Sequence, residues 1–165
     1  MIEKYLVKLF EHNNWANLQI VQACYALSDE QLDAEPTSAT KGSIRRTLTH
    51  LAASQQGYLS LLTQPIEARV RVPPAFEDLQ ESVRASGEGL LSLVRGEGGL
   101  PSGTRLQTKD GYLVEPWVVL VQVIDHGKEH REQICSMLTS LGVAPPDLDG
   151  WTFGEAKNSL VPMPT

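Results

Sequence analysis

Several features that direct a chain to other protein classes are scarce in this sequence. The two cysteines, Cys24 and Cys135, have no CxxC spacing, which favours reduced thiols of an intracellular protein over a disulfide or a metal pair. The longest hydrophobic run, Val118 to Ile124, contains a glutamine and is far too short to span a bilayer. With a net charge of -6 and no run of like charges, the chain offers no basic groove for nucleic acid. We therefore expect a cytoplasmic protein with neither nucleic-acid nor membrane partners.

What the sequence does contain is the composition of an ordinary globular domain. Its 165 residues suffice to bury a core without disulfides, and 41% of them are hydrophobic against 21% charged. No internal repeat or low-complexity segment divides the chain. We expect a single domain over residues 1–165.

Residues 2–27 have the period of a long amphipathic helix. Positions that alternate by three and four residues are apolar except for Asn13, and such a seam is typical of a helix packed on neighbours. Ser28 followed by Gln31 resembles a capping box and predicts a short extra helical turn. A loop is expected over 35–42. The predicted inward seam is Ile2, Leu6, Leu9, Asn13, Ala16, Ile20, Ala23 and Leu27.

A second helix is predicted from the N-cap Ser43 to about Thr63, where Gln64-Pro65 ends it. Beside its apolar seam runs a stripe of mostly small side chains, which leaves room for another group, and His50 lies in the middle of that stripe. The apolar seam is Ile44, Leu48, Leu51, Gln55, Tyr58 and Leu62. The second stripe is Thr47, His50, Ser54, Gly57 and Leu61.

A third helix is predicted over 75–94, although Gly87 and Gly89 within it each cost roughly 1 kcal/mol relative to alanine. Its expected inward residues are Phe76, Leu79, Val83, Leu90 and Leu93. A linker over 96–103 separates this helix from the rest of the chain.

The last part of the chain predicts a small hairpin and a fourth long helix. Asp110-Gly111 between β-prone flanks is a hairpin signal within 104–115. Pro116 suits the first turn of the helix, and Gly142 suits the position just past its end. We expect an all-α fold: a four-helix bundle with long crossover connections and a small β-hairpin before the last helix.

Two histidines on the last helix have the spacing of a metal-binding pair. His126 and His130 are one turn apart, so both imidazoles project from one face and can bind one metal from a rigid backbone. Gly127 follows the first histidine where zinc metalloproteases have glutamate, so this is not that motif. Pairs at this spacing also arise by chance on surfaces, but this one lies in an apolar stripe where unpartnered imidazoles are costly. The stripe is Val119, Val123, His126, His130, Ile134, Met137 and Leu141.

His50 supplies a third imidazole from the second helix. We therefore predict one divalent transition metal on His50, His126 and His130. Three neutral imidazoles leave at least one open position, which is typical of a catalytic rather than a structural site. The fourth histidine, His12, lies about 100° off the seam of the first helix and is expected at the surface.

The residues around this site suggest no general base. Asp125 and Glu129 point off the histidine face, and we expect them to be solvated. Trp15 is expected to pack, Asn13 is equally compatible with packing and with lining the site, and Arg131 is expected in a salt bridge or in solvent. Cys135 points about 180° away from His126, so no Cys-His pair competes with the metal.

The chain resembles the DinB/YfiT-like family of metalloenzymes from Met1 to Phe153. Asn14-Trp15-Ala16-Asn17 resembles that family's Trp-Ala-Asn signature, Thr49-His50-Leu51 its second-helix histidine, and Pro145–Asp149 its tail. His126–Ile134 resembles its HxxxHRGQI segment, with Glu132 in place of the usual glycine. Gln55-Gln56 stands where an acidic residue is often found. The resemblance implies a four-helix bundle that holds zinc, nickel or iron at the positions of His50, His126 and His130.

The resemblance also implies an activity, because relatives include transferases and isomerases that use low-molecular-weight thiols. The leading hypothesis is a metal-dependent transferase or hydrolase acting on a small molecule, with such a thiol as a candidate cosubstrate. Homodimers are common among relatives, so a homodimer is expected. The alternative is a non-catalytic, dimeric binding module that the metal stabilises, and it needs the same ligands.

Overall fold

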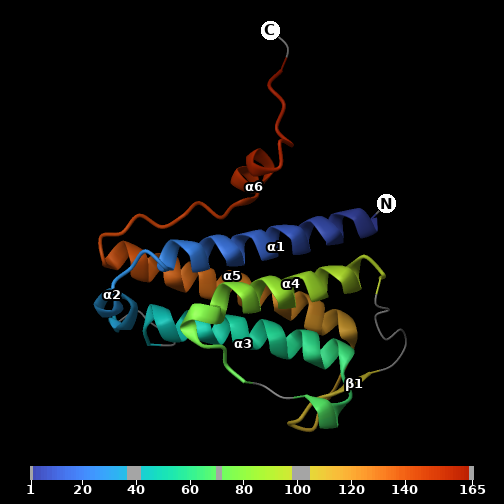
Figure 1. The fold of residues 1–165 in the computed structure, drawn as a ribbon. Coiled ribbons are helices and arrows are strands. Elements are labelled where there is room, and N and C mark those ends of the chain that lie inside the picture. Colours follow the sequence, from blue (N-terminus) through green and yellow to red (C-terminus); the bar gives the residue numbers. More distant parts are fainter. Residues whose placement is uncertain (1, 37–41, 70–71, 98–104, 164–165) are drawn as a thin grey trace.

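Helices form most of the structure, and one small hairpin joins two of them (Figure 1). The computed structural model describes residues 2–36, 42–69, 72–97 and 105–163, with side chains from Lys4 onward. The long helices are α1 (Ile2–Cys24), α3 (Ile44–Thr63), α4 (Leu79–Val94) and α5 (Pro116–Ser140). The shorter elements are α2 (Asp29–Asp33), α6 (Gly150–Ala156), 3-10 turns at Ile66–Ala68 and Phe76–Asp78, and the antiparallel strands β1 (Leu106–Gln107) and β2 (Leu113–Val114). The predicted all-α class and the hairpin before the last long helix are confirmed.

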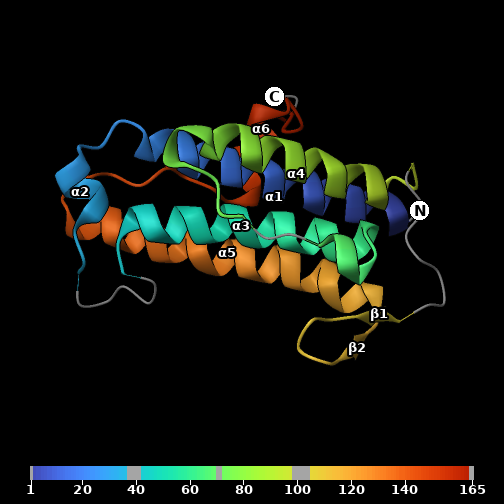
Figure 2. The same cartoon turned by 60° about the horizontal axis from the view of Figure 1, so that its bottom comes forward.

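The four long helices lie side by side, as Figures 1 and 2 both show. Helix α1 packs against α4 and α5, and α3 packs against the same two helices. Helices α3 and α4 run in the same direction, so the chain between them returns along their length (Figure 2). Within the described ranges, no helix is both long and apolar enough to cross a bilayer.

Local signals set most helix ends as the sequence predicts. Ser28 and Gln31 form the expected capping box at α2, and the Ser43 side chain caps α3. Gly142 has a φ of 72° just after α5, where the left-handed conformation favours glycine. Helix α4 begins later than predicted because residues 76–78 form a 3-10 turn first. The predicted loop over 35–42 and the linker over 96–103 fall largely outside the described residues.

Two apolar clusters fill the space between the long helices, and buried polar and small residues separate them. One cluster includes Ile20, Leu48 and Ile134, and the other includes Phe10 and Leu90. On every long helix, most of the buried residues that lie between these two levels are polar residues or glycine. We call them the polar layer: Asn13, Asn14, Asn17, Ser54, Gln55, Ser86, Gly87, Gly127, His130 and Arg131.

Helix α1 is turned differently from the prediction. Leu9 belongs to the predicted seam but is 54% exposed, whereas its neighbour Phe10 is fully buried. The rotation brings Asn14 inside, against α4 at Gly87, where a Cβ atom would lie 2.4 Å from Asn14 Oδ1. The close approach of α1 to α4 therefore determines the buried face, which an apolar seam read from α1 alone misses.

The C-terminal segment forms a helix, α6, that the sequence pattern did not predict. Phe153 of α6 is buried, with its ring centroid 5.4 Å from those of both Trp15 and His12. His12 Nε2 lies 2.7 Å from the carbonyl oxygen of Leu148. The expectation of a surface His12 is therefore wrong, because the chain after α5 folds back over this side of α1 and leaves the ring half-buried.

Candidate metal centre

The three predicted ligands come together between α3 and α5. His126 Nε2 lies 3.2 Å from His50 Nε2 and 3.1 Å from His130 Nε2. The potential ligand atoms all lie within 4.8 Å of one another, so the three residues form a group able to hold a metal ion. His130 is buried, and the other two rings are half-buried. The i, i+4 spacing places two of the rings on one face of α5, and the packing of α3 against α5 brings the third.

The donor set and its spacing suit a divalent transition metal. Imidazole nitrogens bind such metals at about 2.0–2.1 Å, so two ligands in a tetrahedral arrangement lie about 3.3 Å apart. The observed separations of 3.1 and 3.2 Å are close to this value. All three rings present the same atom, Nε2, to the common centre.

The orientation of the His130 ring is set by a neighbour on its own helix. His130 Nδ1 lies 2.7 Å from Gln133 Oε1. A carbonyl oxygen only accepts, so Nδ1 carries the hydrogen and Nε2 keeps its lone pair for a metal. Gln133 in turn donates from Nε2 to Glu129 Oε1 over 3.1 Å. The i, i+3 spacing of these residues is visible in the sequence, yet the prediction did not single out Gln133.

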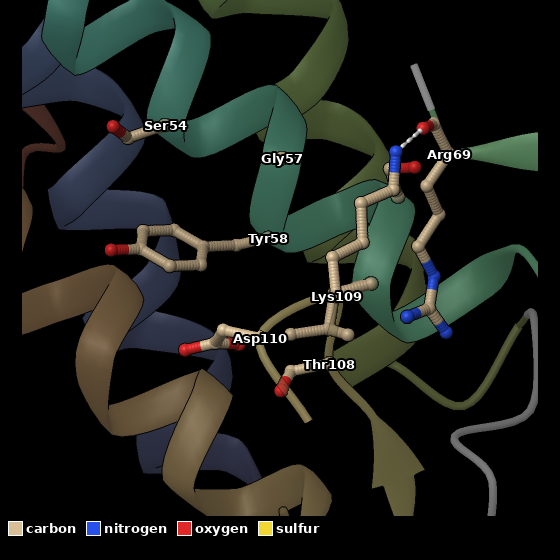
Figure 3. Close-up of a pocket in the computed structure, with 9 residues that line it drawn as sticks. Ser54, Gly57, Tyr58, Arg69, Thr108, Lys109 and Asp110 are labelled. Carbon is tan, nitrogen blue, oxygen red and sulfur yellow. Dashed lines mark hydrogen bonds between the residues drawn. The ribbon is translucent and has the colours of Figure 1, made fainter. Parts of the chain in front are cut away.

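A cavity of about 440 Å³ is lined by residues of α3, by Arg69 and by the hairpin turn (Figure 3). Ser54 lines it, and its Oγ lies 3.5 Å from His50 Nε2. Tyr58 also lines it, and its ring is edge-on to the His126 ring with 5.6 Å between centroids. The cavity therefore adjoins two of the three imidazoles. Its remaining lining residues are Gly57, Ser60, Leu61, Arg69, Thr108, Lys109 and Asp110.

The neighbouring face of α5, which packs against α1, carries a buried arginine. Arg131 Nη1 donates to Asn13 Oδ1 over 2.8 Å and to Asn17 Oδ1 over 2.5 Å. Burial lowers the pKa of Arg131 to about 10, which still leaves the guanidinium charged at neutral pH. The expectation of a salt bridge or solvent is wrong for Arg131, because α1 covers it and offers amide oxygens instead. Asn13 accordingly serves packing within the polar layer.

Gln55 extends this buried network rather than reaching the histidines. It accepts from Asn17 Nδ2 over 2.7 Å and donates to the Val83 carbonyl and to Ser86 Oγ, at 2.9 and 2.8 Å. The amide at this position thus joins α1, α3 and α4. A carboxylate there would have to accept from the Val83 carbonyl oxygen, which has no hydrogen to give.

The acidic residues next to the histidines and Trp15 lie where the sequence predicts. Asp125 and Glu129 are exposed on α5, and Trp15 packs against Phe153. Burial raises the pKa of Cys24 to about 12 and also raises that of Cys135, so both thiols stay protonated at neutral pH. Cys135 packs beside the apolar cluster that contains Ile134.

A family model described as the DinB family matches residues 1–160. No curated protein matches the chain.

Proposed function

Because the chain belongs to the DinB family and three of its histidines can hold a metal ion between them, we propose that it is a metal-dependent transferase or hydrolase acting on a small molecule. The observation that carries this proposal is the group of three histidines, two of which contact Ser54 and Tyr58 in the lining of a cavity of about 440 Å³. Structural metal sites are closed by four protein ligands, whereas three ligands next to a cavity leave space for a substrate. We interpret the four long helices as a four-helix bundle with this site in its middle.

Each part of the proposed site has a separate task. When bound, a zinc, nickel or iron ion would supply a Lewis acid with an open coordination position. Gln133 holds the His130 ring so that Nε2 faces the centre. Ser54 Oγ lies beside the His50 ring, within reach of a small molecule bound there.

We propose a low-molecular-weight thiol as cosubstrate. Thiolates are preferred ligands of zinc and nickel. The chain's own thiols do not compete, because burial raises the pKa of both Cys24 and Cys135. A thiol that reaches the histidines therefore has to come from outside the chain.

A non-catalytic role is the second candidate, because the three histidines also join α3 to α5. In this case the metal would hold two helices together within a dimeric binding module. Exposed apolar residues on α1 and α5 offer a surface for the proposed homodimer: Tyr5, Leu9, Trp117 and Val121. Light scattering should then give the mass of two chains, and a monomer at tens of micromolar would exclude the dimer.

Metal analysis tests the ligand assignment. The purified protein should contain close to one zinc, nickel or iron per chain, and His50→Ala, His126→Ala and His130→Ala should each lose most of it. His12→Ala is the matched control, since this histidine lies under the C-terminal segment and should leave the metal content unchanged. A triple variant that keeps its metal would show that the site is misassigned.

Chelation separates the enzyme from the scaffold. In the enzyme, the apolar clusters hold the helices together, so the metal-free chain should remain helical by circular dichroism and lose all turnover of electrophiles with added thiols. In the scaffold, metal-binding energy is folding energy, and chelation should unfold the chain. A metal-free chain that stays folded, with no turnover in the metal-bound form, would leave only a binding role.

A further inference from the structure

The cavity of about 440 Å³ is formed by α3, by the segment just after it, and by the hairpin turn, which lies much later in the sequence. One wall is α3, from Ser54 to Leu61, the second is Arg69 after α3, and the third is the hairpin turn that contains Lys109 and Asp110. The volume of about 440 Å³ lies within the range of small-molecule sites. Gly57 lines the α3 wall, and a Cβ atom there would meet nothing within 4 Å, so open space lies next to this residue.

Two cations line this cavity, and main-chain carbonyls hold both of them. Arg69 donates from Nε to the Gln64 carbonyl oxygen over 2.9 Å and from Nη1 to that of Gln107. Lys109 Nζ donates to the Arg69 carbonyl oxygen over 2.5 Å. Among the described residues, no ion pair includes either cation, and the ion pairs that do form lie elsewhere. Both side chains thus keep N–H groups and full charge for a ligand.

The third charged residue of the cavity lies at a different end. In Figure 3, the Asp110 carboxylate and the Tyr58 ring point towards the same side, while Lys109 points away from them to Arg69. Arg69 and Lys109 against Asp110 give the cavity a local charge of +1, in a chain whose net charge is -6. This arrangement favours one anionic group at the Arg69 end and disfavours a second one beside Tyr58.

We propose that the cavity binds a small monocarboxylate whose carboxylate lies on Arg69 and Lys109 and whose reactive group faces His50 and His126. The proposal rests on the proposed function, because a bound metal gives the histidine end its chemistry. Arg69 supplies a planar pair of donors, which suits a carboxylate, and Lys109 adds a second charge. The ligand then spans the cavity from the hairpin to the histidines.

The test uses the full chain loaded with Co²⁺, whose visible spectrum changes when a thiol enters the metal site. The probes are mercaptoacetate, 3-mercaptopropionate and 6-mercaptohexanoate, each compared with the mercaptoalcohol of equal length. For the length that fits best, the carboxylate should bind about tenfold more tightly than the alcohol at low salt. This preference should shrink as salt is added, because the cations are partly exposed.

Three variants test the residues. Arg69→Gln and Lys109→Gln should each reduce the preference for the mercaptocarboxylate over the mercaptoalcohol from about tenfold to about threefold or less. Neither variant should weaken the binding of the mercaptoalcohols. Asp110→Asn is the matched control in the same turn and should keep or increase the preference. If no length of carboxylate is preferred, or if Asp110→Asn lowers the preference as Lys109→Gln does, the proposal is overturned.

A metal-free arm keeps this outcome separate from the proposed function. Nuclear magnetic resonance on the metal-free chain should show that 3-mercaptopropionate shifts the Arg69 and Lys109 side-chain signals more than 3-mercaptopropanol does. These shifts without any Co²⁺ spectrum would support carboxylate binding by Arg69 and Lys109 and would contradict the metal-dependent function. A Co²⁺ spectrum without these shifts would support the metal-dependent function and contradict carboxylate binding by Arg69 and Lys109.

Discussion

Helix α5 carries two polar clusters that differ by a single residue in register. His126 and His130 face α3, whereas Gly127 and Arg131, one position later, face α1. On the α1 side, the Arg131 guanidinium is satisfied by the amide oxygens of α1, and the network continues through Gln55 to α4. On the α3 side, three nitrogens of one kind converge on each other.

The two clusters show two kinds of buried polar group: those around Arg131 stabilise the fold, and the three histidines are arranged to bind a ligand. The Arg131 side joins donors to acceptors of another kind, and among its described buried side-chain atoms only Asn13 Nδ2 and Asn14 Oδ1 lack a hydrogen-bond partner. The histidine side brings like atoms together, and neutral imidazoles have only one donor each. A bound cation satisfies all three Nε2 lone pairs at once, which no arrangement of hydrogens on these rings achieves.

The largest effect is expected when the Arg131 cluster is broken. Arg131→Ala leaves the oxygens of Asn13 and Asn17 buried without their donor and opens a cavity, so the free energy of unfolding should fall by about 3 kcal/mol. Denaturant titration measures this loss. Arg84→Ala, an exposed arginine paired with Glu81, is the control and should change little. If the metal content per folded chain also falls, the two clusters are not independent.

A methyl group added at Gly127, where α5 contacts α1, should lower the free energy of unfolding by less than Arg131→Ala does. In Gly127→Ala, the new Cβ atom would lie 2.7 Å from Asn13 Oδ1 and 3.0 Å from Arg131 Nη1. Because these two atoms hold each other, neither can yield cheaply, and we expect a loss of about 2 kcal/mol in unfolding free energy. Gly57→Ala meets nothing within 4 Å and should be neutral or stabilising by about 0.5–1 kcal/mol. Equal losses in the two variants would contradict a close contact at Gly127.

The smallest effect is expected for a change on the histidine side. Gln133→Ala removes the acceptor for His130 Nδ1, so metal affinity should fall about tenfold while the metal-free chain keeps its stability. Competition with a chromophoric chelator measures the affinity. Glu132→Gln, on the exposed side of α5, should bind metal normally. An unchanged affinity in Gln133→Ala would mean that packing alone orients the His130 ring.

Much of the fold follows from local signals that the sequence displays. The caps at Ser28 and Ser43 and the Asp110-Gly111 turn depend on neighbouring residues, and the structure has them where they were predicted. The His126 and His130 pair is equally local. The juxtaposition of His50 with this pair could be anticipated because its helix face carries small residues.

The remainder depends on contacts between distant segments. The apolar pattern of α1 allows two faces, and the approach of Gly87 on α4 decides between them by bringing Asn14 inside. The burial of His12 depends on a segment more than a hundred residues later, which packs through Phe153. No spacing relates Arg69 to Lys109, so the cavity between them has no signature in the sequence.

The distance along the chain between the three histidines also bears on how the protein unfolds. His126 and His130 meet as soon as α5 forms, but His50 lies 76 residues before His126. A metal held by all three would therefore close a long loop, and the entropic cost of closing it rises only slowly with loop length. Helices α3 and α5 would then be unable to separate until one nitrogen is released. Such a link slows the unfolding rate and leaves the folding rate unchanged if it forms after the transition state.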